Sequence, residues 1–330
     1  MNWAQLLIGL TLLGAATVYV ITRNPNADGH LEHYAFQKFK RNFGVTYKNQ
    51  GEESYRLSVF LENLKSIEAN NANPLSTHVE EVNSFTDLTE EEFAARYLMK
   101  DLPQQMNKDL PILEMETLAA PQVIDWTAKN VLPPVKNQQQ CGSCWAFSTA
   151  GMLEGVYNIH ESPQTPISFS EQQLVDCCGA QGFGCEGCNG AWPTDAVAYT
   201  QKFGIVQESQ YAYTAKDGSC KTALQGTGYK PSAQFQVAAT DAALQAALQV
   251  QPISICVDAS KWSSYSKGIF SNCSAKPSAA DHAVLLVGLN ADNTWKVRNS
   301  WGTSWGQSGY ITLAAGNTCG LENYAIYATY

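Results

Sequence analysis

Hydrophobic residues in the first third of the chain recur at the spacing of an amphipathic helix. After Glu52 they fall on one helical face, with charged side chains between them. These apolar residues are Tyr55, Val59, Phe60, Leu64 and Ile67. The Asn-Asn-Ala-Asn-Pro sequence of residues 70–74 predicts the end of this helix. A second helix is expected from Thr89, because Thr-Glu-Glu-Glu there is a capping box ahead of Phe93.

The pattern changes near Pro121. Residues 102–120 contain prolines and little periodicity, which is typical of an extended linker. Helices are then expected over residues 143–160 and 170–177. After about Gln236, short apolar runs predict β-strands, which cover residues 253–257, 283–289, 295–297 and 310–313. A helical half followed by a strand-rich half predicts an α+β fold whose two subdomains enclose a cleft.

The N-terminus carries an apolar run. Residues 6–21 contain no charge, and this run is somewhat short for a helix that spans a membrane. Gly14 and the two alanines after it are small enough for cleavage by a signal peptidase. We therefore expect residues 1–21 to be a signal peptide. No basic residue precedes the run and Arg23 follows it, so an uncleaved membrane anchor stays open as the alternative.

Composition narrows the class of protein. Hydrophobic residues make up 45% and charged residues 15%, which is enough for a substantial core. The net charge of −9 argues against nucleic acid as a partner. All ten cysteines lie between Cys141 and Cys319, which indicates disulfides formed in an oxidising compartment. We expect a protein of the secretory pathway that resides in a lysosome or vacuole or outside the cell.

Cys144 is the candidate nucleophile. It follows Gly142 and Ser143 where a helix is expected to begin, and a helix N-terminus lowers the pKa of a thiol. A thiol also needs a base, and only His160 and His282 occur after Pro121. His160 lies 16 residues further along the same expected helix. That separation is about 24 Å, so His160 does not reach the thiol.

His282 is therefore the expected base. An imidazole needs an acceptor that orients its second nitrogen, and Asn299 is a suitable neutral one. Trp301 follows closely in the sequence and would cover that hydrogen bond against water.

At these residues the chain resembles the papain and cathepsin L family. Cys-Gly-Ser-Cys-Trp ending at Trp145, with His282 located 138 residues after Cys144, is similar to the signature of that family. The resemblance implies that the side-chain amide of Gln138 and the backbone N–H of Cys144 hold the substrate oxyanion. It also implies an endopeptidase that works through an acyl-enzyme thioester without metal or cofactor. The expected partners are peptide and protein substrates and cystatin-like inhibitors, and the mature form is expected to be a monomer.

The first third resembles a cathepsin L-type propeptide. Six residues match its helix motif at fixed intervals; they are Glu52, Arg56, Phe60, Asn63, Ile67 and Asn71. Residues 83–87 resemble its second motif, although Glu81 stands where that motif has glycine. We therefore expect an inhibitory propeptide at residues 24–117, which follows the cleft in the non-cleavable direction, and a papain-like peptidase domain at residues 118–330. Protonation of Asp87 and other propeptide acids is expected to loosen the propeptide in acid.

Two arrangements of the cysteines are considered. Cys177, Cys178, Cys185 and Cys188 have the residue type of a zinc site, but an adjacent pair suits tetrahedral coordination poorly. The resemblance instead implies the disulfides Cys141–Cys188, Cys177–Cys220 and Cys273–Cys319. The extra pair Cys178–Cys185 would close a small loop, as a comparable pair does in cathepsin B. We expect no metal.

The resemblance also locates a substrate pocket. The backbone of Gly190 and Ala191 would pair with the substrate, although Ala191 and Gln139 both replace family glycines. The pocket for the side chain two residues before the scissile bond would be lined by Trp192, Pro193, Cys256, Ala280 and Tyr324. These side chains are uncharged, so we expect a preference for apolar residues there unless Tyr324 swings outward. Cys256 is expected to be a free thiol.

A catalytically silent papain-like protein that binds or stores ligands is the alternative function. Gln138, Cys144, His282 and Asn299 are all present, which argues against it.

Overall fold

The computed structural model describes residues 25–99, 110–115 and 122–330. The chain divides into two compact units, and the boundary along the sequence lies between Thr46 and Tyr47. The first unit contains helix α1 (Pro25–Phe43), which the sequence analysis did not predict. Phe36, Phe39 and Phe43 place aromatic rings at helical spacing along it. The expected signal peptide and the expected boundary between residues 117 and 118 lie outside the described residues. Of the expected linker, residues 110–115 are described.

Helix α2 (Gln50–Ala72) confirms the helix expected after Glu52. Asn49 caps its N-terminus by accepting a hydrogen bond from the Glu52 amide at 3.0 Å. Helix α3 (Glu90–Tyr97) confirms the predicted capping box, because Thr89 and Glu92 exchange side-chain and backbone hydrogen bonds. Both helices therefore begin where the sequence places a side chain that satisfies free amides.

The six motif residues of α2 have three structural roles. The Glu52 carboxylate accepts from the Lys48 amide at 2.8 Å, which secures the start of the helix. Phe60 and Ile67 are buried. Arg56, Asn63 and Asn71 bind the segment that returns along the helix. The partners are the carbonyls of Asp87, Thr86, Leu88 and Glu80 and the carboxylate of Glu92.

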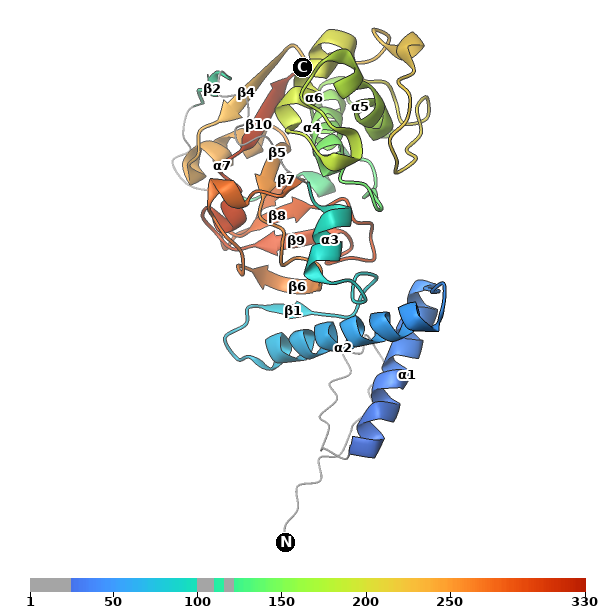
Figure 1. Cartoon of the computed structure of the whole chain (residues 1–330). Helices are drawn as coiled ribbons and strands as arrows, with labels where there is room; N and C mark the ends of the chain where they lie inside the picture. The colour runs from blue at the N-terminus through green and yellow to red at the C-terminus, as the bar shows by residue number, and fades with distance from the viewer. Residues whose placement is uncertain (1–24, 100–109, 116–121) are drawn as a thin grey trace. The chain divides into compact units, whose positions relative to one another are not determined.

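The second unit also contains a helical part and a ten-stranded sheet within its described residues (Figure 1). Besides α2 and α3, its α-helices are α4 (Cys144–Glu161), α5 (Glu171–Cys177), α6 (Pro193–Phe203) and α7 (Asp241–Val250). The strand order is β1-β6-β9-β8-β7-β5-β10-β4-β2, and β3 pairs with β7. The bounds are β1 (His78–Glu80), β2 (Ile112–Leu113), β3 (Ile124–Asp125), β4 (Ala233–Val237), β5 (Ile253–Val257), β6 (Tyr265–Phe270), β7 (His282–Leu289), β8 (Trp295–Arg298), β9 (Tyr310–Leu313) and β10 (Ala325–Thr329). This architecture confirms the expected α+β fold, in which a helical region precedes the rest.

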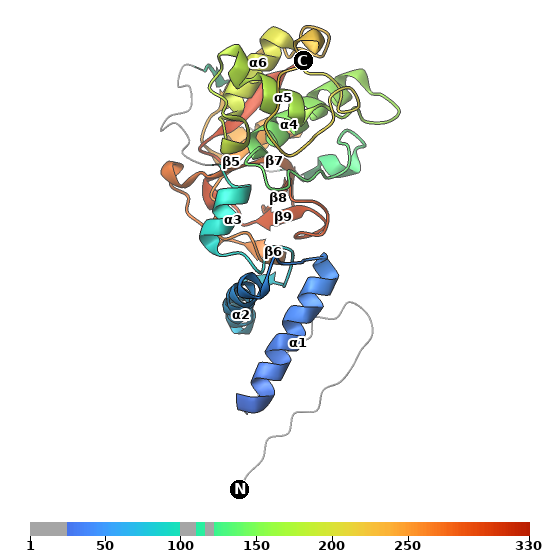
Figure 2. The same cartoon turned by 45° about the vertical axis from the view of Figure 1, so that its right-hand side comes forward.

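Helix α4 packs against β7 and β5, as the second view also shows (Figure 2). Its Ser148 hydroxyl donates to the Val284 carbonyl at 2.7 Å and pairs with the Ser254 hydroxyl at 2.7 Å. Gly151 lies so close to Leu285 that a Cβ there would be 3.1 Å from a methyl carbon. The helix that begins with Cys144 is thus fixed on the strand that begins with His282.

The propeptide contributes strands to the sheet of the peptidase domain. Strand β1 pairs antiparallel with β6, and Asn83 donates to the Ser263 carbonyl at 2.6 Å. Further along, β2 in the expected linker pairs parallel with β4. The sequence analysis predicted an extended linker but neither strand pair.

Four disulfides join the cysteines of the peptidase domain. They are Cys141–Cys188, Cys177–Cys220, Cys178–Cys185 and Cys273–Cys319. Because the four cysteines of the alternative zinc reading all lie in these bonds, they have no thiolates to offer a metal. Within the described ranges, no helix combines the length and hydrophobicity that a membrane span needs.

The contacts of Arg56 generate a prediction about the propeptide. Its guanidinium is buried and binds both the Glu92 carboxylate and the Asp87 carbonyl. Arg56→Ala removes these charge-assisted hydrogen bonds, and we expect it to lower the free energy of unfolding of the propeptide by about 2 kcal/mol. Thermolysin should then cleave the precursor about thirtyfold faster at pH 7.

Lys65→Ala is the matched control, since Lys65 is exposed on the same helix. It should leave the cleavage rate within about twofold. Equal rates for Arg56→Ala and the wild type would contradict the assigned role of the guanidinium.

Candidate active site

Cys144 and His282 lie at the first positions of two elements that pack together. Cys144 is the first residue of α4 and is fully buried. The amide of Ala283, next to His282 in β7, is close enough to the Cys144 thiol to favour its ionised form by hydrogen bonding. The two residues expected to react are therefore brought to the same point, where the helix N-terminus meets the start of the strand.

The His282 ring is held on one side only. Its Nε2 lies 2.8 Å from the Asn299 Oδ1, and the Ser300 amide donates to the same oxygen at 2.8 Å. Because that oxygen accepts, Nε2 carries the proton and Nδ1 has the free electron pair of a base. Nδ1 is buried and has no hydrogen-bond partner among the described residues. The Trp301 ring lies 4.8 Å from the imidazole ring and covers it.

Burial sets the charge of this pair in the precursor. It raises the pKa of the Cys144 thiol to about 12, although the amides of Ala283 and Trp145 pull in the other direction. Burial also lowers the pKa of His282 to about 4, opposed by the bond to Asn299. The low thiol pKa expected from the helix N-terminus is thus outweighed, because loss of water disfavours both charged forms. The precursor holds a neutral thiol beside a neutral imidazole.

The propeptide occupies the amide that is expected to bind the oxyanion. Gln138 is buried, and its Nε2 donates to the Tyr97 carbonyl at 2.9 Å and to the Cys141 carbonyl at 3.0 Å. The Ser300 hydroxyl fixes the other side of the amide by donating to Oε1 at 2.6 Å. The Tyr97 carbonyl therefore takes one of the donors that a substrate would use.

The direction of the propeptide follows from the next contacts. The Met99 amide donates to the Asp281 carbonyl at 2.7 Å, and Met99 packs against Gly190. From residue 97 to residue 99 the chain runs from Gln138 toward Gly190. A substrate that pairs with Gly190 ahead of its scissile bond would run the opposite way, so the propeptide presents its backbone in reverse.

The expected side-chain pocket gathers residues from four parts of the chain. The Trp192 and Tyr324 rings lie 4.8 Å apart, and the Cys256 amide donates to the Tyr324 carbonyl at 3.1 Å. Trp192, Pro193 and Cys256 are buried, whereas Ala280 and Tyr324 are half-buried. Cys256 is a free cysteine, and burial raises its pKa above the usual range of a thiol. Ala280 directly follows the short 3-10 helix Pro277–Ala279, two residues before β7 begins.

The two replaced glycines differ in backbone conformation. Gln139 has a φ of 53°, which favours glycine, and its amide is held by the Asn137 Oδ1 at 2.8 Å. Ala191 has no such positive φ, whereas its neighbour Gly190 has a φ of 128°. Alanine is therefore tolerated at position 191, while glutamine at position 139 carries backbone strain.

A buried ion cluster behind the site was missed. The Lys136 ammonium lies 2.8 Å from the Glu154 carboxylate and 2.5 Å from that of Glu171. Burial raises the pKa of Glu171 to about 8, against the pull of Lys136. A glutamate at position 154, inside an otherwise apolar helix, is the signal that would have indicated a buried partner.

The chain is similar to known proteins over most of its length. Residues 120–329 match the family described as "Papain family cysteine protease", and residues 36–93 match the "Cathepsin propeptide inhibitor domain (I29)". "Cathepsin L 2" of Paramecium tetraurelia is 37% identical over 315 residues, covering 94% of this chain and 97% of the relative. "Digestive cysteine proteinase 1" of Homarus americanus is 38% identical over 312 residues, covering 89% and 94%.

A solved structure is similar over most of the chain as well. The digestive procathepsin L2 proteinase from the larval midgut of Tenebrio molitor superposes with a TM-score of 0.81 at 30% identity. The match covers 91% of this chain and 100% of that one.

Protonation of Asp87 was expected to loosen the propeptide in acid, but the surroundings of Asp87 contradict this. Burial raises the pKa of Asp87, outweighing the opposing effects of Tyr47 and Arg56. A raised carboxyl pKa stabilises the folded form at low pH, and this stabilisation is lost as the pH rises. Glu92 behaves in the opposite way, because Arg56 lowers its pKa. Glu92 therefore stabilises the folded form at pH values above 4.5, the ordinary pKa of a glutamate. This stabilisation is lost as the pH falls through the lowered pKa.

Glu92→Gln should therefore accelerate processing of the precursor in mild acid. We expect about a fivefold faster rate at pH 5.5, because the substitution mimics the protonated state that otherwise requires stronger acid. Asp87→Asn is the comparison, and it should not accelerate processing at any pH. Rates measured by gel from pH 4 to 7 decide this; faster processing of Asp87→Asn alone would reverse the assignment.

Proposed function

Because the chain belongs to the papain family of cysteine proteases and is a zymogen with its own inhibitory propeptide, we propose that Cys144 is the nucleophile and His282 its acid and base. The observation that carries this is the free, buried Nδ1 of His282 beside the helix that begins with Cys144. The opposite nitrogen is committed to Asn299. The reaction is hydrolysis of internal peptide bonds.

In the proposed cycle, departure of the propeptide readmits water and lets the proton of Cys144 move to the Nδ1 of His282. The thiolate sulfur attacks the carbonyl carbon, and the oxyanion accepts from the Nε2 of Gln138 and the backbone N–H of Cys144. The imidazolium then donates its proton to the leaving amine, and the C–N bond breaks. A thioester remains. His282 takes a proton from water, which attacks the thioester, and the returning proton restores the thiol.

The proposed processing divides the chain at two points. Residues 1–21 are removed as a signal peptide, and cleavage near residue 118 separates the propeptide (residues 24–117) from the peptidase domain (residues 118–330). Four disulfides and the similarity to cathepsin L proteins support a place in the secretory pathway. We assign the mature form to a lysosome, a vacuole or the extracellular space. It acts as a monomer, and cystatin-like inhibitors would bind the cleft that the propeptide leaves.

The nucleophile is tested by Cys144→Ala. We expect a folded, unprocessed precursor with no measurable peptidase activity, because Cys256, the other free thiol, has no histidine and no helix N-terminus. The variant precursor is first matured in trans with tagged wild-type enzyme, which is then removed. Peptide hydrolysis by the matured variant is the measurement. Residual activity above about 1% of wild type would reject the assignment. Titration of the wild-type enzyme with an epoxide inhibitor tests the alternative of a silent binding protein. One reactive site per chain in that titration would exclude it.

Substrate preference is tested by the pocket around Tyr324. Burial of a Leu, Val or Phe side chain against Trp192 and Cys256 stabilises the complex by roughly 1.5–3 kcal/mol. An Arg there would lose water without a carboxylate partner. We expect kcat/KM to be at least tenfold lower for Arg than for Leu in peptides that differ only two residues before the scissile bond. Equal values would show that Tyr324 leaves the pocket open.

A further inference from the structure

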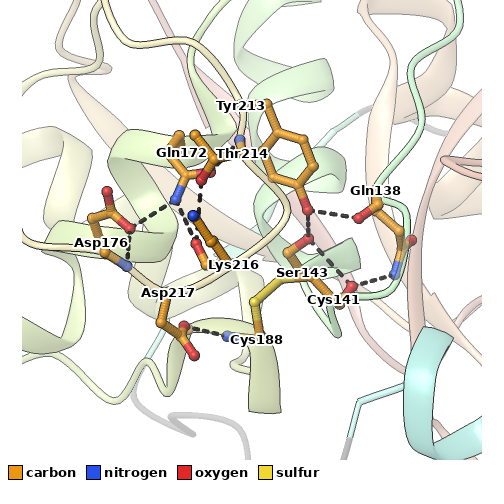
Figure 3. Close-up of a disulfide and its surroundings, with 12 residues drawn as sticks. Gln138, Cys141, Ser143, Gln172, Asp176, Cys188, Tyr213, Thr214, Lys216 and Asp217 are labelled. Carbon is orange, nitrogen blue, oxygen red and sulfur yellow. Dashed lines mark hydrogen bonds between the residues drawn. A yellow bond between two sulfur atoms is a disulfide. The ribbon is translucent and has the colours of Figure 1, made fainter.

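A hydroxyl group on a distant loop connects the oxyanion side of the site with the helix that carries the nucleophile (Figure 3). The Tyr213 hydroxyl donates to the Gln138 carbonyl at 2.7 Å. The same oxygen lies 2.6 Å from the Ser143 hydroxyl. Since the single phenol proton is committed to Gln138, Ser143 is the donor to Tyr213. A continuous chain of hydrogen bonds thus runs from Ser143 through Tyr213 to Gln138.

The bond to Gln138 holds a strained peptide. The peptide group between residues 138 and 139 is fixed at its carbonyl by Tyr213 and at its N–H by the Asn137 Oδ1. Gln139 has the positive φ of 53° that a side chain disfavours. The amide side chain of Gln138 projects from this same residue. The position of the oxyanion donor therefore depends on how firmly the strained peptide is held.

The bond to Ser143 removes a competing role. Ser143 is the N-cap of α4, where a serine ordinarily accepts a hydrogen bond from a first-turn amide. Here its side chain makes no capping hydrogen bond. Its hydroxyl contacts Tyr213 instead and lies 3.4 Å from the Cys141 carbonyl. The Ala146 amide donates to the Ser143 carbonyl at 2.8 Å, and the amides of Cys144 and Trp145 reach the Cys144 sulfur.

The loop that carries Tyr213 is rigidly attached to α5. The Gln172 side chain accepts from the Thr214 amide at 2.8 Å and donates to the Lys216 carbonyl at 2.8 Å. Asp176 accepts from the Gly218 amide and from the Tyr211 hydroxyl, at 2.8 and 2.7 Å. Figure 3 shows the loop lying beside the Cys141–Cys188 disulfide, where Asp217 accepts from the Cys188 amide. Such a support keeps a single hydroxyl in place with little further loss of entropy.

We propose that Tyr213 is a positioning residue for the oxyanion hole, and that its hydroxyl, oriented by the hydrogen bond from Ser143, sets the geometry of Gln138. This inference rests on the proposed role of Gln138 in the reaction. Tyr213 touches neither the substrate nor the reacting atoms. It acts because the preorganised donors stabilise the transition state only when they are held in place beforehand.

Tyr213→Phe tests the proposal, since phenylalanine keeps the ring that packs edge-on against Phe147 at 4.9 Å and removes only the hydroxyl. Each variant precursor is matured with a trace of affinity-tagged wild-type enzyme, which is then removed. We expect kcat for a peptide amide to fall about tenfold and KM to stay within twofold. Alkylation of Cys144 by iodoacetamide forms no oxyanion, so its rate should stay within twofold of the wild type.

Tyr229→Phe is the matched control. Its buried hydroxyl has no hydrogen-bond partner among the described residues, so kcat should stay within twofold. Gln138→Ala should lower kcat by about a hundredfold, and adding Tyr213→Phe to it should cause no further loss.

The outcomes separate the inference from the function on which it rests. An unchanged kcat for Gln138→Ala would reject the proposed oxyanion donor itself. A normal kcat for Tyr213→Phe beside an impaired Gln138→Ala would overturn the positioning role alone. A parallel fall in alkylation, an equal loss in Tyr229→Phe, or a further loss in the double variant would also overturn it. If Tyr213→Phe fails to fold, Ser143→Ala breaks the same hydrogen-bond chain, and an unchanged kcat for it would then refute the proposal.

Discussion

The structure depends on the attachment of α4 to β7. Neither element carries the chemistry alone, because the thiol begins one and the imidazole begins the other. Ser148 and Gly151 hold the two elements at hydrogen-bond and van der Waals distance. The contact is made by the second and third turns of the helix, so the first turn is left to face the cleft. The N-terminal ends of α4 and β7 are thus placed precisely because the middle parts of the two elements pack together.

The same close packing explains how the precursor is silenced. A thiolate and an imidazolium both need water or charged neighbours, and Cys144 and His282 are both fully buried in the precursor. Inhibition therefore does not require that the catalytic groups be displaced. Met99 and Tyr97 occupy backbone partners of the cleft, while burial alone keeps Cys144 and His282 neutral. The precursor thus combines a blocked cleft backbone with a reactive pair that is buried and uncharged.

The sequence predicted the elements that have strong local signals. Helix α2 was found from its apolar spacing, and helix α3 from a capping box directly ahead of Phe93. Helix α7 was missed inside a region expected to be strand-rich, although Leu244, Ala247 and Leu248 show helical spacing behind a Thr240 cap. Helix α1 was missed because no comparable cap was recognised.

The chemistry of the site was predictable to the extent that residue types limit it. His282 emerged because one other histidine was available and lay too far along a helix. The role of Tyr213 was not visible, because 75 residues separate it from Gln138 and only the tertiary fold brings them together. The expected loosening by protonation of Asp87 was wrong for a related reason, since the burial that raises the Asp87 pKa cannot be read from neighbouring residues.

The pairing of β1 with β6 has a consequence for the mature molecule. When β1 leaves with the propeptide, β6 becomes an edge strand whose unpaired N–H and C=O groups face solvent. Such an edge invites another extended chain to add to the sheet and starts aggregation. Lys267 stands in the middle of β6 opposite Val79, and Gly268 bends the strand with a φ of 90°. A charge and a bend are the features with which sheet proteins discourage unwanted partners, so the strand that receives the propeptide is also built to remain soluble after losing it.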